Sequence, residues 1–340
     1  MRADARALPT IGAMAIVAAA FAAPAHADTR LWLAGVNYES AQLVVPVIVV
    51  RSTDDRGHEW NAWLTGWTLG ADWSVARTPR RRWRVEMNVT PVNAHSSNYV
   101  YVDGRRDPAA AFSAASFDGA GGIEIAHTRR WTGRYHGVFL YERVGDVPPH
   151  VAQSWRDPFV GAETVHSYSR VRSETRLGSR WEGVKTEGSA QIYTGTRTWS
   201  RVRGSAGAGA RAGPLFLSGR AAAFRGQSLD TVSAFLIGGS WDVAVPNLLP
   251  GYRYAEFRVE RAATAGAGAD LRIHGPWEIG LRGAYLNAPG LSRRGTAVQL
   301  MTIWKGAVVD AGVAWPDAGK HGDHGPAVVF ATITAAVIGR

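Results

Sequence analysis

Apolar and polar residues alternate with a period of two along much of this chain. The clearest run covers positions 82–90, where Trp83, Val85, Met87 and Val89 alternate with Arg82, Arg84, Glu86, Asn88 and Thr90. Neighbouring residues of an extended strand point to opposite faces, so this run predicts a strand with one apolar and one charged face. If the apolar face meets lipid, the charged face needs a water-filled interior, as in a transmembrane barrel.

Four more runs of this kind occupy the last hundred residues, at 255–260, 277–285, 308–315 and 328–337. The connections between them differ in length. The tight turns are His274–Pro276 and Lys305–Gly306, and the long polar loops are Asn287–Gly295 and Pro316–Gly325. Short turns at one end and long loops at the other are typical of transmembrane β-barrels.

The remaining strand candidates lie at 31–38, 43–50, 60–74, 121–128, 135–144, 164–174, 190–199, 215–224 and 231–239. Loops are expected at 103–115 and 145–161, and the Gly/Ala-rich stretch 205–214 fits either a turn or a strand of small side chains. At roughly 10 residues for each spanning strand, we predict an all-β, transmembrane antiparallel barrel of about 14–16 strands. Sixteen is the favoured number, and residues 28–340 form this one domain.

The first 27 residues have the pattern of a cleavable signal peptide. Arg2 and Arg6 precede the apolar run Ala7–Ala23, and Ala25-His26-Ala27 forms a small-x-small cleavage site. A buried N-terminal helix is the alternative. We therefore expect export through the inner membrane and location in the bacterial outer membrane, because no later apolar run approaches the roughly 20 residues that a spanning helix needs.

The amino-acid composition limits the chemistry and the partners that we expect for this chain. The chain has no cysteine, which excludes disulfides and thiolate chemistry. The net charge is +10, but the arginines are spread over the strands of an exported chain, so we expect no nucleic acid. The expected partners are outer-membrane lipids and lipopolysaccharide. The 14 Trp and 10 Tyr suit aromatic girdles at the two membrane interfaces.

The stretch from Phe235 onward resembles the outer-membrane insertase and translocator barrels of the bacterial surface antigen (BamA/TamA-like) superfamily. The resemblance rests on Gly238-Gly239, the loop Ser240–Pro250, Gly251-Tyr252-Arg253, the step Glu256-Phe257-Arg258 and five final strands. It implies a barrel, here without periplasmic domains, whose long loop is held in the lumen. Arg253 would fasten that loop through Asp310 or another lumen-facing carboxylate.

Further polar residues are expected to line the lumen. Glu256 and Glu260 would flank Arg258 on one strand face, either supporting the loop or balancing charge in water. The other expected lining residues are Arg82, Arg84, Glu86, Glu278 and Arg282.

Catalytic chemistry is not expected. His321, Asp323 and His324 are candidate metal ligands, but a solvated glycine-rich loop is the simpler interpretation. The adjacent pairs His166-Ser167 and His95-Ser96 point to opposite strand faces and so do not form a nucleophile–base contact. Asp54-Asp55 resembles a paired-carboxylate site but suits a turn. We expect no metal and no cofactor.

The favoured function is passage or handling of a substrate across the outer membrane, as a translocator, an assembly factor or a pore. A periplasmic or secreted chain is a possible partner, and the barrel is expected to be a monomer. The alternatives are an outer-membrane lipid hydrolase and a structural or adhesive barrel with a plugged lumen.

Overall fold

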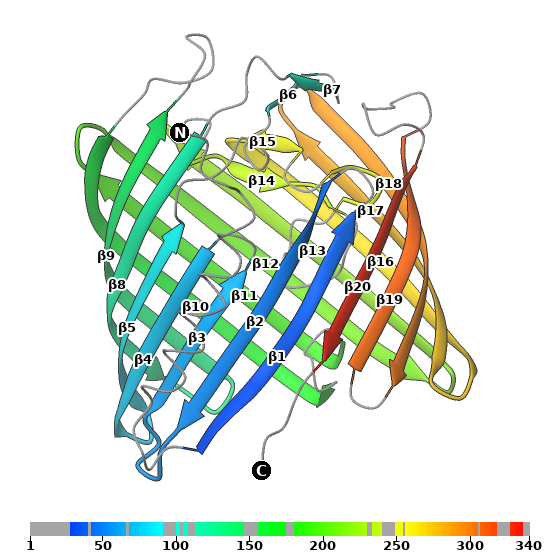
Figure 1. Ribbon diagram of the computed structural model, residues 1–340, viewed down its shortest axis with the longest axis horizontal. Helices are drawn as coiled ribbons and strands as arrows, with labels where there is room; N and C mark the ends of the chain where they lie inside the picture. Colours follow the sequence, from blue (N-terminus) through cyan, green and yellow to red (C-terminus); the bar gives the residue numbers. More distant parts are fainter. Residues whose placement is uncertain are drawn as a thin grey trace, which may run out of the picture.

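Sixteen antiparallel strands close into one barrel in the computed structural model (Figure 1). The structure describes residues 28–39, 42–65, 68–90, 100–102, 105–107, 113–145, 156–174, 180–229, 233–239, 249–253, 256–304, 307–317 and 327–335. The predicted fold class is confirmed. The predicted signal peptide, residues 1–27, lies outside the described residues.

Each barrel strand pairs with its neighbour in chain order, and the first strand pairs with the last. The barrel strands are β1 (Asp28–Glu39), β2 (Gln42–Thr53), β3 (Glu59–Thr65), β4 (Thr68–Thr78), β5 (Arg81–Thr90), β8 (Ser113–Ala126), β9 (Trp131–Gly145), β10 (Arg156–Glu174), β11 (Trp181–Thr194), β12 (Thr198–Ala212), β13 (Leu215–Gln227), β16 (Arg261–His274), β17 (Trp277–Ala288), β18 (Leu291–Trp304), β19 (Ala307–Pro316) and β20 (Val328–Ala335). Among the described residues, no helix is long and apolar enough to cross a bilayer.

Four short strands lie outside this ring. β6 (Val100–Val102) pairs with β7 (Arg105–Asp107), and β14 (Phe235–Ile237) pairs with β15 (Phe257–Val259). The β14–β15 hairpin belongs to the connection between β13 and β16, and its apolar side chains pack against inward-facing residues of the barrel wall.

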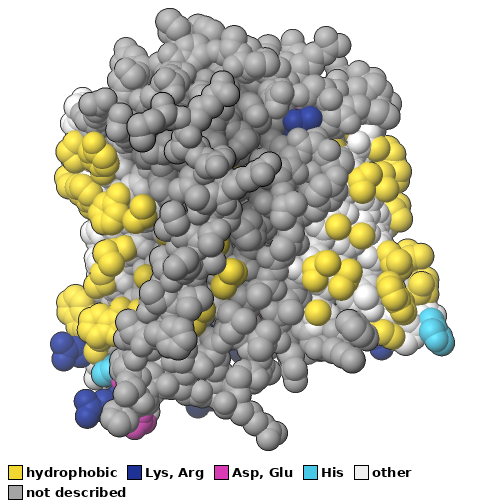
Figure 2. All heavy atoms as spheres, in the orientation of Figure 1, with side chains coloured by type: hydrophobic (Ala, Val, Ile, Leu, Met, Phe, Trp, Pro, Cys, Tyr) yellow, Lys and Arg dark blue, Asp and Glu magenta, His cyan; other side chains and the backbone are white. Residues whose placement is uncertain are grey.

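The apolar and polar side chains of β5 lie on opposite faces of the wall, as the alternating pattern predicts. Trp83, Val85, Met87 and Val89 are exposed on the exterior, and the polar residues between them are turned toward the lumen. Figure 2 shows hydrophobic side chains on the left and right flanks of the visible face of the barrel. An exposed apolar exterior around a polar interior is the arrangement that a bilayer stabilises, because lipid and water contact opposite faces of each strand.

The connections are sorted by length. At one end of the barrel no connection exceeds six residues, and every longer connection lies at the other end. We call these the short-turn end and the long-loop end.

The prediction that Asn287–Gly295 is a long loop is wrong: β17 continues to Ala288, Pro289 and Gly290 form a tight turn, and β18 begins at Leu291. Gly290 has a positive φ of 70°, which favours glycine at this turn.

Other predicted boundaries also change. The single strand expected at 60–74 is two strands, β3 and β4, and the Gly/Ala stretch 205–214 lies mostly in β12. The alternating run 255–260 is not a barrel strand; its central residues form β15, and the wall is continued instead by β16. Phe257 is buried in an internal apolar cluster, so the alternation there reflects packing inside the barrel rather than contact with lipid.

Candidate functional site in the barrel lumen

Part of the β13–β16 connection folds into the lumen. We call its described residues, 233–239, 249–253 and 256–260, the lumen segment. Phe235, Ile237, Leu249, Tyr252 and Phe257 of this segment are all buried in one apolar cluster. The cluster includes inward-facing residues of three barrel strands: Ala222 and Phe224 of β13, Ala262 of β16 and Leu286 of β17. The hydrophobic effect therefore holds the segment against the wall.

The backbone of the segment lies directly against the wall at two glycines. A Cβ built on Gly295 of β18 would lie 1.7 Å from the carbonyl oxygen of Pro250, and one built on Gly251 would lie 2.2 Å from the carbonyl carbon of Trp315. Gly251 also has a positive φ of 83°. Real side chains do not fit at such distances, so both positions require glycine while the segment is docked.

Tyr252 lies at the centre of the docked region. It is 1% exposed, and its ring centroid is 5.1 Å from that of Phe257. Its phenol oxygen accepts a hydrogen bond from the backbone N–H of Asp317, just beyond β19, at 3.3 Å. Burial raises the pKa of Tyr252 to about 12, so the phenol remains neutral at physiological pH.

The polar residues predicted near this segment fall into different environments. Arg253, Glu256 and Asp310 are all buried, at 6%, 3% and 7% exposure. The backbone N–H of Arg253 donates to Glu256 Oε2 at 2.8 Å, which closes the turn after Tyr252. Arg258 is half-buried and Glu260 is exposed, so Glu256 and Glu260 do not share one environment. Pairing of Arg253 with Asp310 stays a prediction.

Ion pairs line the wall of β2 to β5, where Arg82, Arg84 and Glu86 lie. Arg82 is 2.8 Å from Glu59, and Arg84 is 2.9 Å from Asp72 and 3.6 Å from Glu86. The paired charges explain how these arginines are accommodated in the lumen, because each is compensated by carboxylates on its own or a nearby strand.

A second group of charges, near the short-turn end, contains Glu278 and Arg282. Asp270 of β16 is 3.0 Å from Arg180 and 2.7 Å from Arg282, and Arg180 also pairs with Glu278. Arg180, which immediately precedes β11, thereby reaches the inner faces of β16 and β17. Sequence reasoning missed Asp270 and Arg180, because their meeting depends on a register that no local pattern reveals.

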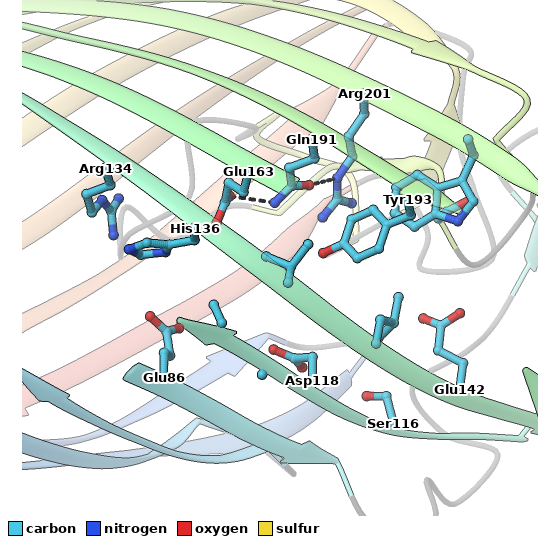
Figure 3. Close-up of a pocket in the computed structure, with 16 residues that line it drawn as sticks. Glu86, Ser116, Asp118, Arg134, His136, Glu142, Glu163, Gln191, Tyr193 and Arg201 are labelled. Carbon is cyan, nitrogen blue, oxygen red and sulfur yellow. Dashed lines mark hydrogen bonds between the residues drawn. The ribbon is translucent and has the colours of Figure 1, made fainter. Parts of the chain in front are cut away.

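A cavity of about 390 Å³ lies between the inner wall of β5 to β12 and the lumen segment (Figure 3). Arg201 donates to Gln191, and Gln191 donates to Glu163 at 2.5 Å, so a polar chain crosses three neighbouring strands. The remaining lining residues are Glu86, Ser116, Asp118, Gly119, Ala120, Arg134, His136, Val138, Leu140, Glu142, Tyr193, Trp199 and Ser233. Such a lining suits water and polar solutes.

The other sequence candidates are not brought into a catalytic arrangement. The His166 ring contacts His127, Trp131 and Tyr135 on the exterior. Asp54 lies in the β2–β3 turn, where its carboxylate accepts hydrogen bonds from the backbone N–H groups of Arg56 and His58. His95, Ser96, His321, Asp323 and His324 lie outside the described residues. Within the described ranges, no cluster of three or more metal-ligating side chains is found.

The fold is the one seen in outer-membrane β-barrels, here with an inward-folded loop docked on the wall. A scan against protein-family models finds no match, and a search of curated proteins finds none either. Among solved structures, the chain is similar to BamA from Haemophilus ducreyi lacking POTRA domains 1–3. The identity is 9% and the TM-score is 0.63, over 91% of this chain and 70% of that chain.

The chain is also similar to CdiB from Acinetobacter baumannii, with 10% identity and a TM-score of 0.53 over 92% of this chain and 60% of that chain. CdiB from Escherichia coli gives 11% identity and a TM-score of 0.53, over 89% and 62%. The chain thus spans less than two thirds of either CdiB chain. At these identities the likeness shows the fold alone.

Proposed function

We propose that this protein resides in the bacterial outer membrane and acts as a barrel of the translocator or assembly type, within the BamA/TamA-like superfamily. Its role would be to handle a substrate at or through the membrane, without catalysis of its own. The docked lumen segment carries this proposal. A loop fastened to the inner wall narrows the lumen, which suits a barrel that opens only for its substrate, and conductance distinguishes such a barrel from a diffusion pore with an inward loop.

The physical support lies in how the segment is held. It combines a buried apolar cluster with backbone contacts at Gly251 and Gly295 that leave no room for a side chain. The likeness of fold to BamA and CdiB and the Gly251-Tyr252-Arg253 element are consistent with this reading.

Planar-bilayer conductance of refolded 28–340 protein tests the proposal. We expect rare, brief openings from the wild type, because the docked segment narrows the lumen in the proposed state. The Gly295→Ala variant should open more often and for longer, since its new methyl group meets the Pro250 backbone.

The matched control is Gly283→Ala in the adjacent strand β17. A Cβ at Gly283 meets nothing within 4 Å, so the same substitution should leave conductance unchanged. Large, steady wild-type channels would contradict a closed translocator and favour an open pore. Identical behaviour of both variants would show that docking at Gly295 does not control the lumen.

A further inference from the structure

Seven arginines form a basic rim on the short-turn end of the barrel, from β4 to β10. They are Arg77, Arg80, Arg81, Arg129, Arg130, Arg170 and Arg172, and all are exposed. Within the described part of the chain, none of their guanidinium groups takes part in an ion pair or a hydrogen bond. Figure 2 shows basic side chains below the hydrophobic side chains at this end.

Backbone hydrogen bonds make the rim continuous. The Ala126 N–H donates to the Arg80 carbonyl at 2.8 Å, which joins the β4–β5 turn to the end of β8. The Ser169 N–H donates to the Arg130 carbonyl at 2.8 Å, which joins the β8–β9 turn to β10. Arg80, Arg130 and Arg170 therefore belong to neighbouring segments of one edge.

Some of the nearby carboxylates are already engaged, and Asp55 and Glu124, which take part in no ion pair among the described residues, are too few to balance seven arginines. Glu174 pairs with Lys185 at 2.6 Å, and Asp54 pairs with His58 at 3.0 Å. The rim is thus left with unbalanced positive charge, which favours an anion from outside the chain.

An aromatic group lies on the exterior wall directly beside the rim. Trp131, Tyr135 and Tyr168 are exposed, at 43%, 37% and 37%. The His127 ring centroid is 4.4 Å from that of Trp131, and its Nε2 is 3.3 Å from the Tyr135 Oη. Exposed Trp and Tyr mark the level of lipid headgroups in membrane barrels. The arginines therefore lie where phosphate groups are found.

The wall beside this aromatic group is hollowed. A groove of about 600 Å³ is bordered by Trp131, His166 and Tyr168 and continues over small side chains of β12 and β13, including Gly204, Ala206 and Ala221. The groove offers room for a lipid chain whose headgroup lies at Arg130 and Arg170.

We propose that the basic rim and its groove bind an anionic phospholipid of the phosphatidylglycerol type, in the leaflet at the short-turn end. Short turns face the periplasm in outer-membrane barrels, so this leaflet is the inner one. Phospholipid is favoured over an acidic protein because the rim adjoins the lipid-facing aromatic wall and the groove beside it. Guanidinium groups bind phosphate through paired, charge-assisted hydrogen bonds.

Native mass spectrometry of the refolded protein tests the proposal, with phosphatidylglycerol and phosphatidylcholine supplied at equal concentration. We expect the wild type to retain phosphatidylglycerol preferentially. The double variant R130Q/R170Q should lower that preference about tenfold or more, since each juxtamembrane arginine contributes to the attraction of anionic lipid.

The matched control is R225Q/R261Q. These two exposed arginines face each other on β13 and β16, near the long-loop end. The control should keep the wild-type preference, and both variants should retain heat-modifiable gel migration as evidence of folding. Equal retention of both lipids by the wild type would overturn the proposal and would favour an acidic protein as the ligand of the rim. An equal loss of the phosphatidylglycerol preference in the two double variants would also overturn the proposal, because the preference would then depend on net charge alone.

Discussion

At the scale of single residues, the buried charges of the lumen are the side chains most sensitive to change. Asp270 is 1% exposed and lies between Arg180 and Arg282. Asp270→Ala would leave two guanidinium groups without this partner in a buried site. We expect a loss of about 3–5 kcal/mol in the free energy of unfolding, measured by urea titration of the refolded barrel in lipid vesicles.

A solvent-exposed ion pair serves as the control for the buried charges around Asp270. Glu174 contacts Lys185 at 2.6 Å, but both side chains are well exposed, at 41% and 32%. Glu174→Ala should cost at most about 1 kcal/mol, because water screens the pair. If the two variants lost the same stability, the charges around Asp270 would be solvated and would not anchor the lumen wall.

At the scale of strands, the two faces should respond oppositely to the same charge. Val85 of β5 is 48% exposed on the lipid-facing side, and Val85→Arg should cost about 2–4 kcal/mol near the middle of the membrane. Ala120 of the adjacent strand β8 lines the internal cavity beside Glu86. Ala120→Arg should cost far less in the same unfolding titration. The reverse order would mean that the faces are exchanged.

The alternating pattern predicted the strands whose outer face carries large residues. It failed for β12 and β16, where alanine and glycine occupy much of the outward side and the contrast with the polar side disappears. It also failed at residues 287–295, because β17 and β18 continue with polar residues that the pattern assigned to a loop. The run 255–260 alternates as a wall strand does, since a hairpin packed inside a barrel also has two unlike faces.

Only part of the candidate site could be predicted from the sequence. Gly251, Tyr252 and Arg253 were singled out by resemblance to a known element, and all three are buried where the lumen segment docks. Gly295 and Asp270 carried no local signal. Their roles depend on which strand meets which loop across the lumen, and that is fixed by barrel closure over more than forty residues of intervening chain.

At the scale of the whole molecule, closure depends on the seam between β1 and β20. Six residue pairs join these strands, from Ala34–Ala335 to Glu39–Phe330, whereas thirteen join β12 and β13. Each unpaired edge group in lipid would be costly, so even a short seam must form for the barrel to be stable. The absence of natural cysteines makes the seam testable by disulfide formation.

Val36 and Ile333 are register partners in the seam, so Val36→Cys combined with Ile333→Cys should cross-link readily in the folded protein. The control pairs Val36→Cys with Ala331→Cys, displaced by two residues, where the separation of roughly 7–8 Å exceeds what a disulfide spans. We expect oxidation of the folded protein to give a cross-linked band for the first pair only. In urea, where the register is lost, neither pair should cross-link more than the other. Equal cross-linking of both pairs would show a seam without fixed register. A seam with fixed register would establish that a continuous wall encloses the lumen segment.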